Sequence, residues 1–297
     1  MSQVHVVTDS GANFVTPYFA QDKPLTVVPN RIEIGGQVFR EGVDITAEDA
    51  LRRISRQSTA PKLTSPGVVE FDTAYRSILT RADAVLVLTT SRELTGAFHN
   101  AQTAAQQLGS SRVSVVDSQS IDVGLGMLVK LALEAARTQD DLDEIVRVVR
   151  GGIERVYTVY YTETLGFLRQ NELLGASHAV LGEMLGIKPF LALDNGRILP
   201  IEKVRTRAQA IERLLEFVIE FTDIKDAAVV QSRAGMTEQA RMLQDRLSLE
   251  FPRHVFPTVV YNASLAALIG ADATGIVVLE EEFESIEDYF EDDDDED

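Results

Sequence analysis

Four short segments rich in serine and threonine are the residues of this chain best suited to holding a ligand. Three of them, residues 8–11, 89–96 and 117–120, follow apolar runs typical of strands, and the fourth, residues 64–67, precedes an amphipathic segment. In open α/β sheets, ligands bind beyond the carboxyl ends of the strands. Hydroxyls and free amides in such loops can hold an anion without lysine or arginine. The segments therefore indicate a site for a small anionic or polar head group.

Each of these hydroxyls also has a structural interpretation, because a Ser or Thr before a helix is first of all an N-cap that contributes about 1 kcal/mol. The segment 89–96 is harder to explain by capping alone, since it offers Thr90, Ser91 and Thr95 where one cap needs a single hydroxyl. We take these three residues, with Ser10 and Thr64 of the other segments, as candidate ligand-binding residues. Thr95 is expected mainly to cap the helix that follows.

Signatures of catalysis are mostly missing. The sequence has no cysteine, no Walker loop and no Gly-x-Ser-x-Gly elbow, which excludes thiol chemistry and argues against the common nucleotide and hydrolase sites. The four histidines never lie at ligand spacing from one another, so no metal site is expected. Lys188 enters an apolar strand, where a lysine that extends its amine to water is the ordinary interpretation. We predict no catalytic residue, no metal and no cofactor other than a bound ligand.

The formal net charge of −18 is concentrated at the end of the chain. Residues 280–297 contain 13 acidic residues and no basic one, so the remainder carries a net charge of only −5. Such a run repels itself, and residues 283–297 are expected to form a disordered acidic tail. The absence of a basic stripe argues against nucleic acid as a partner.

Nothing in the sequence indicates a membrane protein. No apolar stretch approaches the ~18 residues of a membrane span, so no stable membrane insertion is expected. The chain enters a strand soon after Met1, with no signal-peptide pattern. We therefore expect a cytoplasmic protein.

The first domain, expected at residues 1–155, alternates strand-like runs with helical patterns. A hairpin with a Gly35-Gly36 turn follows the second strand, and Thr46 is a plausible helix cap. Helical patterns are found at 68–78, 97–108 and 121–136. This alternation predicts an α/β domain with a mainly parallel, doubly wound sheet.

The second domain, expected at residues 156–282, has a different pattern. A strand–turn–strand hairpin is predicted around Asp194-Asn195-Gly196, and a helix begins at Thr206. Further helical patterns surround Leu165 and Leu181, and further strands are expected at 227–230, 255–261 and 275–279. This mixture predicts an α+β domain.

Taken in chain order, these motifs resemble those of the DegV family of bacterial fatty-acid-binding proteins. The likeness spans residues 4 to about 280. The segments that carry it are Thr8-Asp9-Ser10, Thr64-Ser65-Pro66, the loop Thr90–Phe98, Asp117-Ser118 with Gly124, Gly186-Ile187-Lys188-Pro189, and Gly196 with Lys203–Arg207.

The resemblance implies a carrier rather than an enzyme. Family members hold one long-chain fatty acid between two domains and supply it to a separate fatty-acid kinase that makes acyl-phosphate. Their carboxylate-binding Thr and Ser fall on Thr64 and Ser91 of this chain. Burying ~16 methylenes at ~0.8 kcal/mol each gives ~13 kcal/mol of gross transfer free energy. The head group therefore needs orientation more than strong attraction.

Two other classes of function stay open. Related folds occur in dihydroxyacetone kinases and sugar-transport phosphocarriers, so the alternative is an enzyme or phosphocarrier acting on a small hydroxylated or phosphorylated metabolite. Those proteins rely on a histidine or metal carboxylates at the site, and only His99 closely follows one of the four segments. The third class is an interaction or regulatory protein that uses the acidic tail.

Two stretches depart from the family pattern. Asn171–Gly175 stands where the family usually carries Gly-Gly-Arg-Ile-Ser, and Gly270–Gly275 stands where it has Gly-x-His-x-Gly-Pro-Gly. In the family the histidine approaches the carboxylate, and Asp272 takes its place here. An ionised Asp272 would repel a fatty acid unless it is protonated or turned away. We expect Asp272 to change the head-group end without removing the apolar tunnel.

Overall fold

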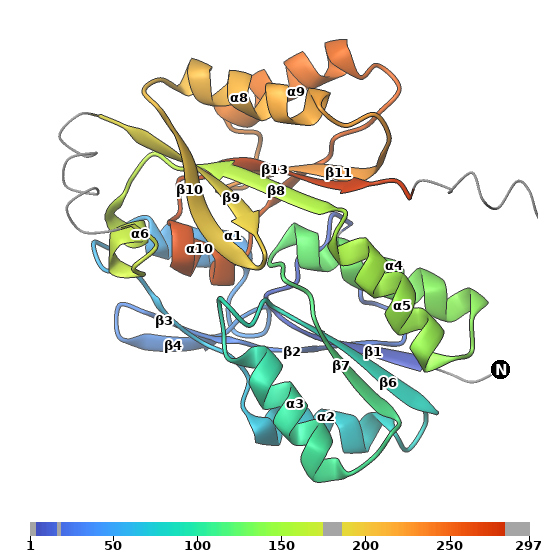
Figure 1. Ribbon diagram of the computed structural model, residues 1–297. Coiled ribbons are helices and arrows are strands. Elements are labelled where there is room, and N and C mark those ends of the chain that lie inside the picture. The colour runs from blue at the N-terminus through green and yellow to red at the C-terminus, as the bar shows by residue number, and fades with distance from the viewer. Residues whose placement is uncertain (1–3, 17–18, 175–185, 283–297) are drawn as a thin grey trace, which may run out of the picture.

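The computed structural model describes residues 4–16, 19–174 and 186–282. The fold is α/β, with a parallel sheet in the N-terminal half and a mixed sheet in the C-terminal half (Figure 1). The helix expected near Leu181 and the acidic tail 283–297 lie outside the described residues.

The N-terminal half is built on a four-stranded parallel sheet. Its strand order is β2-β1-β6-β7, and the strands are β1 (Val4–Asp9), β2 (Leu25–Val28), β6 (Ala84–Thr89) and β7 (Val113–Asp117). The helices that cover it are α2 (Val68–Ile78), α3 (Ala97–Leu108), α4 (Val123–Thr138) and α5 (Leu142–Ile153).

These helices cover both faces of the sheet, as a doubly wound fold requires. Along β6, Val85 and Val87 pack with α2 and α3, whereas Leu86 and Leu88 pack with α4 and α5. The separation follows from the alternation of side chains along a strand. In Figure 1, α2 and α3 lie below the sheet and α4 and α5 lie on its opposite side. The predicted doubly wound domain is confirmed.

A small unit is inserted between β2 and β6. It contains the antiparallel strands β3 (Arg31–Ile34), β4 (Gln37–Arg40) and β5 (Lys62–Thr64), in the order β4-β3-β5, and the helix α1 (Ala47–Ile54). The β3–β4 turn uses Gly35 and Gly36 at φ 57° and 80°, the left-handed region that glycine adopts without strain. The predicted cap is also found, because the Thr46 hydroxyl accepts from the Asp49 amide at 3.2 Å.

The C-terminal half is a six-stranded mixed sheet in the order β10-β9-β8-β13-β11-β12. Its strands are β8 (Val156–Tyr161), β9 (Lys188–Asp194), β10 (Arg197–Val204), β11 (Ile224–Gln231), β12 (Thr258–Val260) and β13 (Thr274–Glu280). Its helices are α6 (Gly166–Gln170), α8 (Arg207–Ile219), α9 (Glu238–Glu250) and α10 (Ala263–Ile269). Figure 1 shows α8 and α9 above this sheet, and α1, α6 and α10 between the two sheets.

One apolar core is shared by the two halves of the chain. Ile32, Leu51 and Met127 from the N-terminal half belong to the same buried cluster as Tyr160 and Leu265 from the C-terminal half. The interface between the two halves is therefore apolar and buried. The domain boundary that we propose between residues 155 and 156 lies between α5 and β8. The inserted unit, which precedes this boundary in the chain, packs against α10, which follows it.

Several elements differ from the sequence expectations. The helices α5, α9 and α10 and the strand β5 were not predicted. The strand β12 covers only three residues of the expected strand 255–261, and α4 begins at Val123 rather than residue 121. The short α10 is buried along nearly its whole length. It therefore lacks the polar face that makes a surface helix recognisable in sequence.

Candidate functional site

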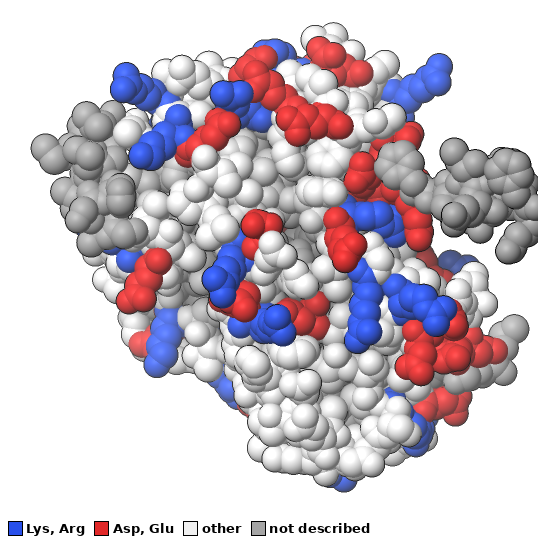
Figure 2. All heavy atoms as spheres, viewed as in Figure 1, with Lys and Arg blue, Asp and Glu red and all other residues white. Residues whose placement is uncertain are grey.

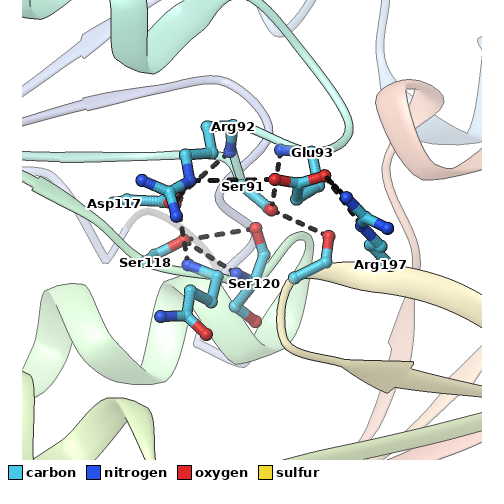
Figure 3. A network of polar contacts seen from close by, with 9 residues as sticks. Ser91, Arg92, Glu93, Asp117, Ser118, Ser120 and Arg197 are labelled. Atoms are coloured by element: carbon cyan, nitrogen blue, oxygen red, sulfur yellow. Dashed lines mark hydrogen bonds and ion pairs between the residues drawn. The ribbon is translucent and has the colours of Figure 1, made fainter.

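Ser91 lies where the two halves of the chain meet. It follows β6, is fully buried, and donates its hydroxyl to the carbonyl oxygen of Gly196 at 2.8 Å (Figure 3). Gly196 belongs to the turn between β9 and β10, at φ 79°. A Cβ at that position would lie 2.3 Å from the Ser91 oxygen, so the close approach requires glycine. The glycine of the predicted turn is therefore also part of the candidate site.

Two ion pairs lie beside this contact. Arg197 reaches Glu93 at 2.7 Å across the two halves, and Arg92 reaches Asp117 at 3.3 Å within the N-terminal half (Figure 3). The basic groups near Ser91 are thus already paired with carboxylates. On the face shown in Figure 2, acidic and basic side chains are interspersed without a continuous basic patch. Hydroxyl and amide donors are consequently the groups available for an anionic head group.

The segment at Thr64 lies against the loop that begins α3. The Asn100 side chain donates to the Pro66 carbonyl at 2.8 Å, and the Ser65 hydroxyl is 3.2 Å from the position of a Cβ on Gly96. Thr64 itself is exposed, and its hydroxyl has no hydrogen-bond partner among the described residues. The structure thus brings the segment of residues 64–67 against the loop of residues 90–96, at the start of α3.

Thr95 has the structural role expected of it. Its hydroxyl accepts from the Ala97 amide at 3.3 Å, at the start of α3, and Gly96 supplies no side-chain cap. Thr95 therefore satisfies one of the unpaired amides at this helix terminus.

Thr90 is bound to a buried carboxylate. Asp9 is fully buried and accepts from the Thr90 amide and hydroxyl at 2.7 Å each and from the Gly11 amide at 2.8 Å. Burial raises the pKa of Asp9, and these donors oppose the effect. Asp9 therefore fixes the loop of Thr90 and Ser91 to the loop that follows β1.

Ser10 is bound to a second buried carboxylate. Its hydroxyl donates to Glu41 at 2.7 Å and accepts from the Asn30 amide at 2.8 Å. Glu41 also accepts from the amide and the hydroxyl of Ser264, the second residue of α10. Burial raises the pKa of Glu41. Ser10 thus helps to join the inserted unit to the C-terminal half.

A third buried carboxylate lies where three loops cross. Asp122 accepts from the Asn13 side chain at 3.0 Å and from the Asn262 amide at 2.8 Å. The side-chain amide of Asn262 donates to the Gly11 carbonyl at 2.8 Å. Burial raises the pKa of Asp122 to about 7. Asp9, Glu41 and Asp122 were not among the residues predicted from the sequence, although the position of Asp9 beside the candidate Ser10 was a usable signal.

Asp272 is not brought to these loops. It accepts from Thr162 at 2.5 Å, beside Glu163, which is paired with Lys188 at the start of β9. Ser91 contacts the turn at the other end of β9, and the seven residues of that strand span about 20 Å. Burial raises the pKa of Asp272. Asp272 and Ser91 therefore lie at opposite ends of the β9–β10 hairpin.

Two further observations limit the chemistry. Among the described residues, no group of three or more His, Cys, Asp or Glu side chains could hold a metal ion. No helix within the described parts of the chain is long and apolar enough to cross a bilayer.

The fold and the site define an α/β protein whose two halves share an apolar core edged by buried hydroxyls. The family model described as "Uncharacterised protein, DegV family" matches residues 3–281. A DegV domain-containing protein of Streptomyces coelicolor is 31% identical over 281 residues, covering 93% of this chain and 98% of the relative. The chain belongs to the DegV family.

Solved structures share the fold over nearly the whole chain. A fatty acid binding DegV family protein from Streptococcus agalactiae has a TM-score of 0.85 at 24% identity and covers 95% of this chain and 100% of its own. The structure described as fatty acid binding of a DegV family protein from Thermus thermophilus has a TM-score of 0.81 at 25% identity, with 94% and 100% covered. The Streptococcus pneumoniae Fatty Acid Kinase (Fak) B3 protein loaded with linoleic acid has a TM-score of 0.78 at 16% identity. The match covers 95% of this chain and 100% of the neighbour.

Proposed function

We propose that this protein binds a single long-chain fatty acid between its two halves. The observation that carries the proposal is the buried Ser91 hydroxyl, which lies at the junction of the halves beside their shared apolar core. Membership of the DegV family and the fatty acids named for its structural neighbours support it. An acyl chain gains most of its binding free energy from apolar contact.

In this proposal Thr64 and Ser91 hold the carboxylate. Thr64 is free of intramolecular partners, and Ser91 exchanges the Gly196 carbonyl for a ligand oxygen. A hydrogen bond to a charged acceptor is worth about 1.5–3 kcal/mol, more than one to a neutral carbonyl, so the exchange favours the ligand. Ser10 and Thr90 support the site through Glu41 and Asp9 and do not touch the head group.

We further propose that the protein is a carrier rather than an enzyme, and that it presents the carboxylate to a separate fatty-acid kinase in the cytoplasm. Support for a kinase partner comes from the Streptococcus pneumoniae neighbour, which is named Fatty Acid Kinase (Fak) B3 protein. Support for a carrier comes from the chemistry of the site, where the carboxylates Asp9 and Glu41 are committed to structural hydrogen bonds.

The test is to extract the purified protein with solvent and to count the fatty acid by mass spectrometry, followed by titration of the delipidated protein. We expect about one mole of fatty acid per mole of protein. The control is Ser111→Ala, which changes an exposed serine before β7. Less than a tenth of a mole per mole, with no binding at micromolar concentrations, would contradict the proposed function.

A further inference from the structure

Four hydroxyls inside the protein have no hydrogen-bond partner among the described residues. One belongs to Thr89, at the end of β6, and the other three belong to Ser120 and Thr158, which are 2% exposed, and to Tyr160, which is 0% exposed. Removing a hydroxyl from water without replacing its hydrogen bond costs free energy, so such groups are rare in folded proteins and need an explanation.

The geometry shows that two of these hydroxyls can share one partner. A Cβ placed on Gly124 would lie 2.3 Å from the Ser120 oxygen and 3.5 Å from the Thr158 oxygen. The two oxygens are therefore no more than about 6 Å apart, a gap that one bridging oxygen atom spans with two ordinary hydrogen bonds. Thr158 and Tyr160 are two residues apart on β8 and so face the same side of the sheet.

The hydroxyls lie on the side of the interdomain core and close to the proposed head group. Tyr160 and Ile121, the residue after Ser120, both belong to the apolar cluster that the two halves share. The carbonyl of Ser120 accepts from the Ser91 amide at 2.9 Å. Figure 3 shows Ser120 in the same network of polar contacts as Ser91. A ligand oxygen that reaches Ser120 is thus separated from a carboxylate at Ser91 by only a few covalent bonds of the ligand.

We propose that the natural ligand is an oxygenated fatty acid, with a hydroxyl or oxo group on one of the first carbons after the carboxylate, and that Ser120, Thr158 and Tyr160 bind this second oxygen. The inference rests on the proposed function, because it assumes that Ser91 holds the carboxylate. It goes beyond that function by naming the class of acid.

The test compares three acids by calorimetric titration of the delipidated protein: hexadecanoic acid, 3-hydroxyhexadecanoic acid and 16-hydroxyhexadecanoic acid. One additional hydrogen bond predicts that the 3-hydroxy acid binds about tenfold more tightly than hexadecanoic acid. The 16-hydroxy acid carries the same group at the far end of the chain and is expected to show no such gain.

Thr158→Val and Tyr160→Phe each remove one of the hydroxyls with little change of shape. Both variants are expected to reduce the preference for the 3-hydroxy acid while leaving the affinity for hexadecanoic acid unchanged. The matched control is Thr89→Val, which removes another buried hydroxyl without a partner, at the end of β6. The control is expected to retain the preference.

The outcomes separate the inference from the function on which it rests. If no long-chain acid binds, the proposed function fails. If the acids bind with equal affinity, the function stands, ordered water satisfies the hydroxyls and the inference is overturned. If Thr158→Val weakens the binding of all three acids equally, these hydroxyls hold the carboxylate itself, which also overturns the inference.

Discussion

Ser91 and Gly196, which are 105 positions apart in the chain, are joined by a hydrogen bond of 2.8 Å. The bond attaches the loop after β6 to the turn between β9 and β10, and thereby closes the candidate head-group site with residues from both halves. It also explains why that turn carries glycine, since any side chain there would meet the Ser91 oxygen.

Gly196→Ala is expected to destabilise the protein and weaken fatty acid binding. The new Cβ would lie 2.3 Å from the Ser91 oxygen, at a backbone φ of 79°. A left-handed non-glycine residue costs roughly 1–2 kcal/mol before any clash. Gly36→Ala is the matched control, with φ 80° and nothing within 4 Å of its Cβ. Chemical denaturation should show a larger decrease in the free energy of unfolding for Gly196→Ala than for Gly36→Ala. Equal decreases would mean that the contact with Ser91 is unimportant.

Ser91→Ala and Thr95→Ala are expected to separate ligand binding from helix capping. Ser91→Ala should weaken fatty acid binding by roughly 1–3 kcal/mol, because a charged acceptor loses a hydrogen bond. Thr95→Ala should lower the free energy of unfolding by about 1 kcal/mol with little change in affinity, because its hydroxyl accepts at the start of α3. Titration and denaturation of both variants check this, and the assignment is wrong if the two changes have the reverse effects.

Asp122 is expected to make the protein less stable as the pH rises. Burial raises its pKa from 3.8 to about 7, so the folded state binds this proton more tightly than the unfolded chain does. The stabilisation from that proton is complete below about pH 4 and is lost as the pH approaches 7. Asp122→Asn should flatten this part of the pH profile, and asparagine tolerates the φ of 58° at this position.

The measurement for Asp122 is the free energy of unfolding between pH 4 and 8 for the wild type and the variant. Asp245→Asn, which changes an exposed carboxylate on α9, is the control. Parallel profiles for the wild type and Asp122→Asn would show that Asp122 does not carry this proton.

Asp272→Asn is expected to leave fatty acid affinity unchanged between mildly acidic and alkaline pH. The sequence predicts that Asp272 lies at the head group, but in the structure it lies with Thr162 at the opposite end of β9 from Ser91. Because the strand β9, about 20 Å long, lies between them, Asp272 does not touch a head group held at Ser91. A pH-dependent affinity that disappears in Asp272→Asn would restore the head-group role.

The local elements were predictable because their signals are local. The helices α2 and α3 begin and end at the residues that the sequence pattern predicts, and Thr206 caps α8 in a capping box with Gln209. Periodicity, caps and turn glycines act within a few residues of the chain. The parallel sheet and the mixed sheet follow from the order of these elements.

Residue types and spacing identify the hydroxyls that could hold a ligand, whereas the packing of the two halves sets which of these hydroxyls already have partners inside the protein. Ser10 and Thr90 satisfy Glu41 and Asp9 inside the protein, whereas Thr64 has no such partner among the described residues. A buried carboxylate must collect donors wherever the fold brings them, and those donors come from segments that are far apart in the chain. The local sequence pattern predicts each strand and loop, whereas the hydrogen-bond partner of each hydroxyl depends on how the two halves pack together.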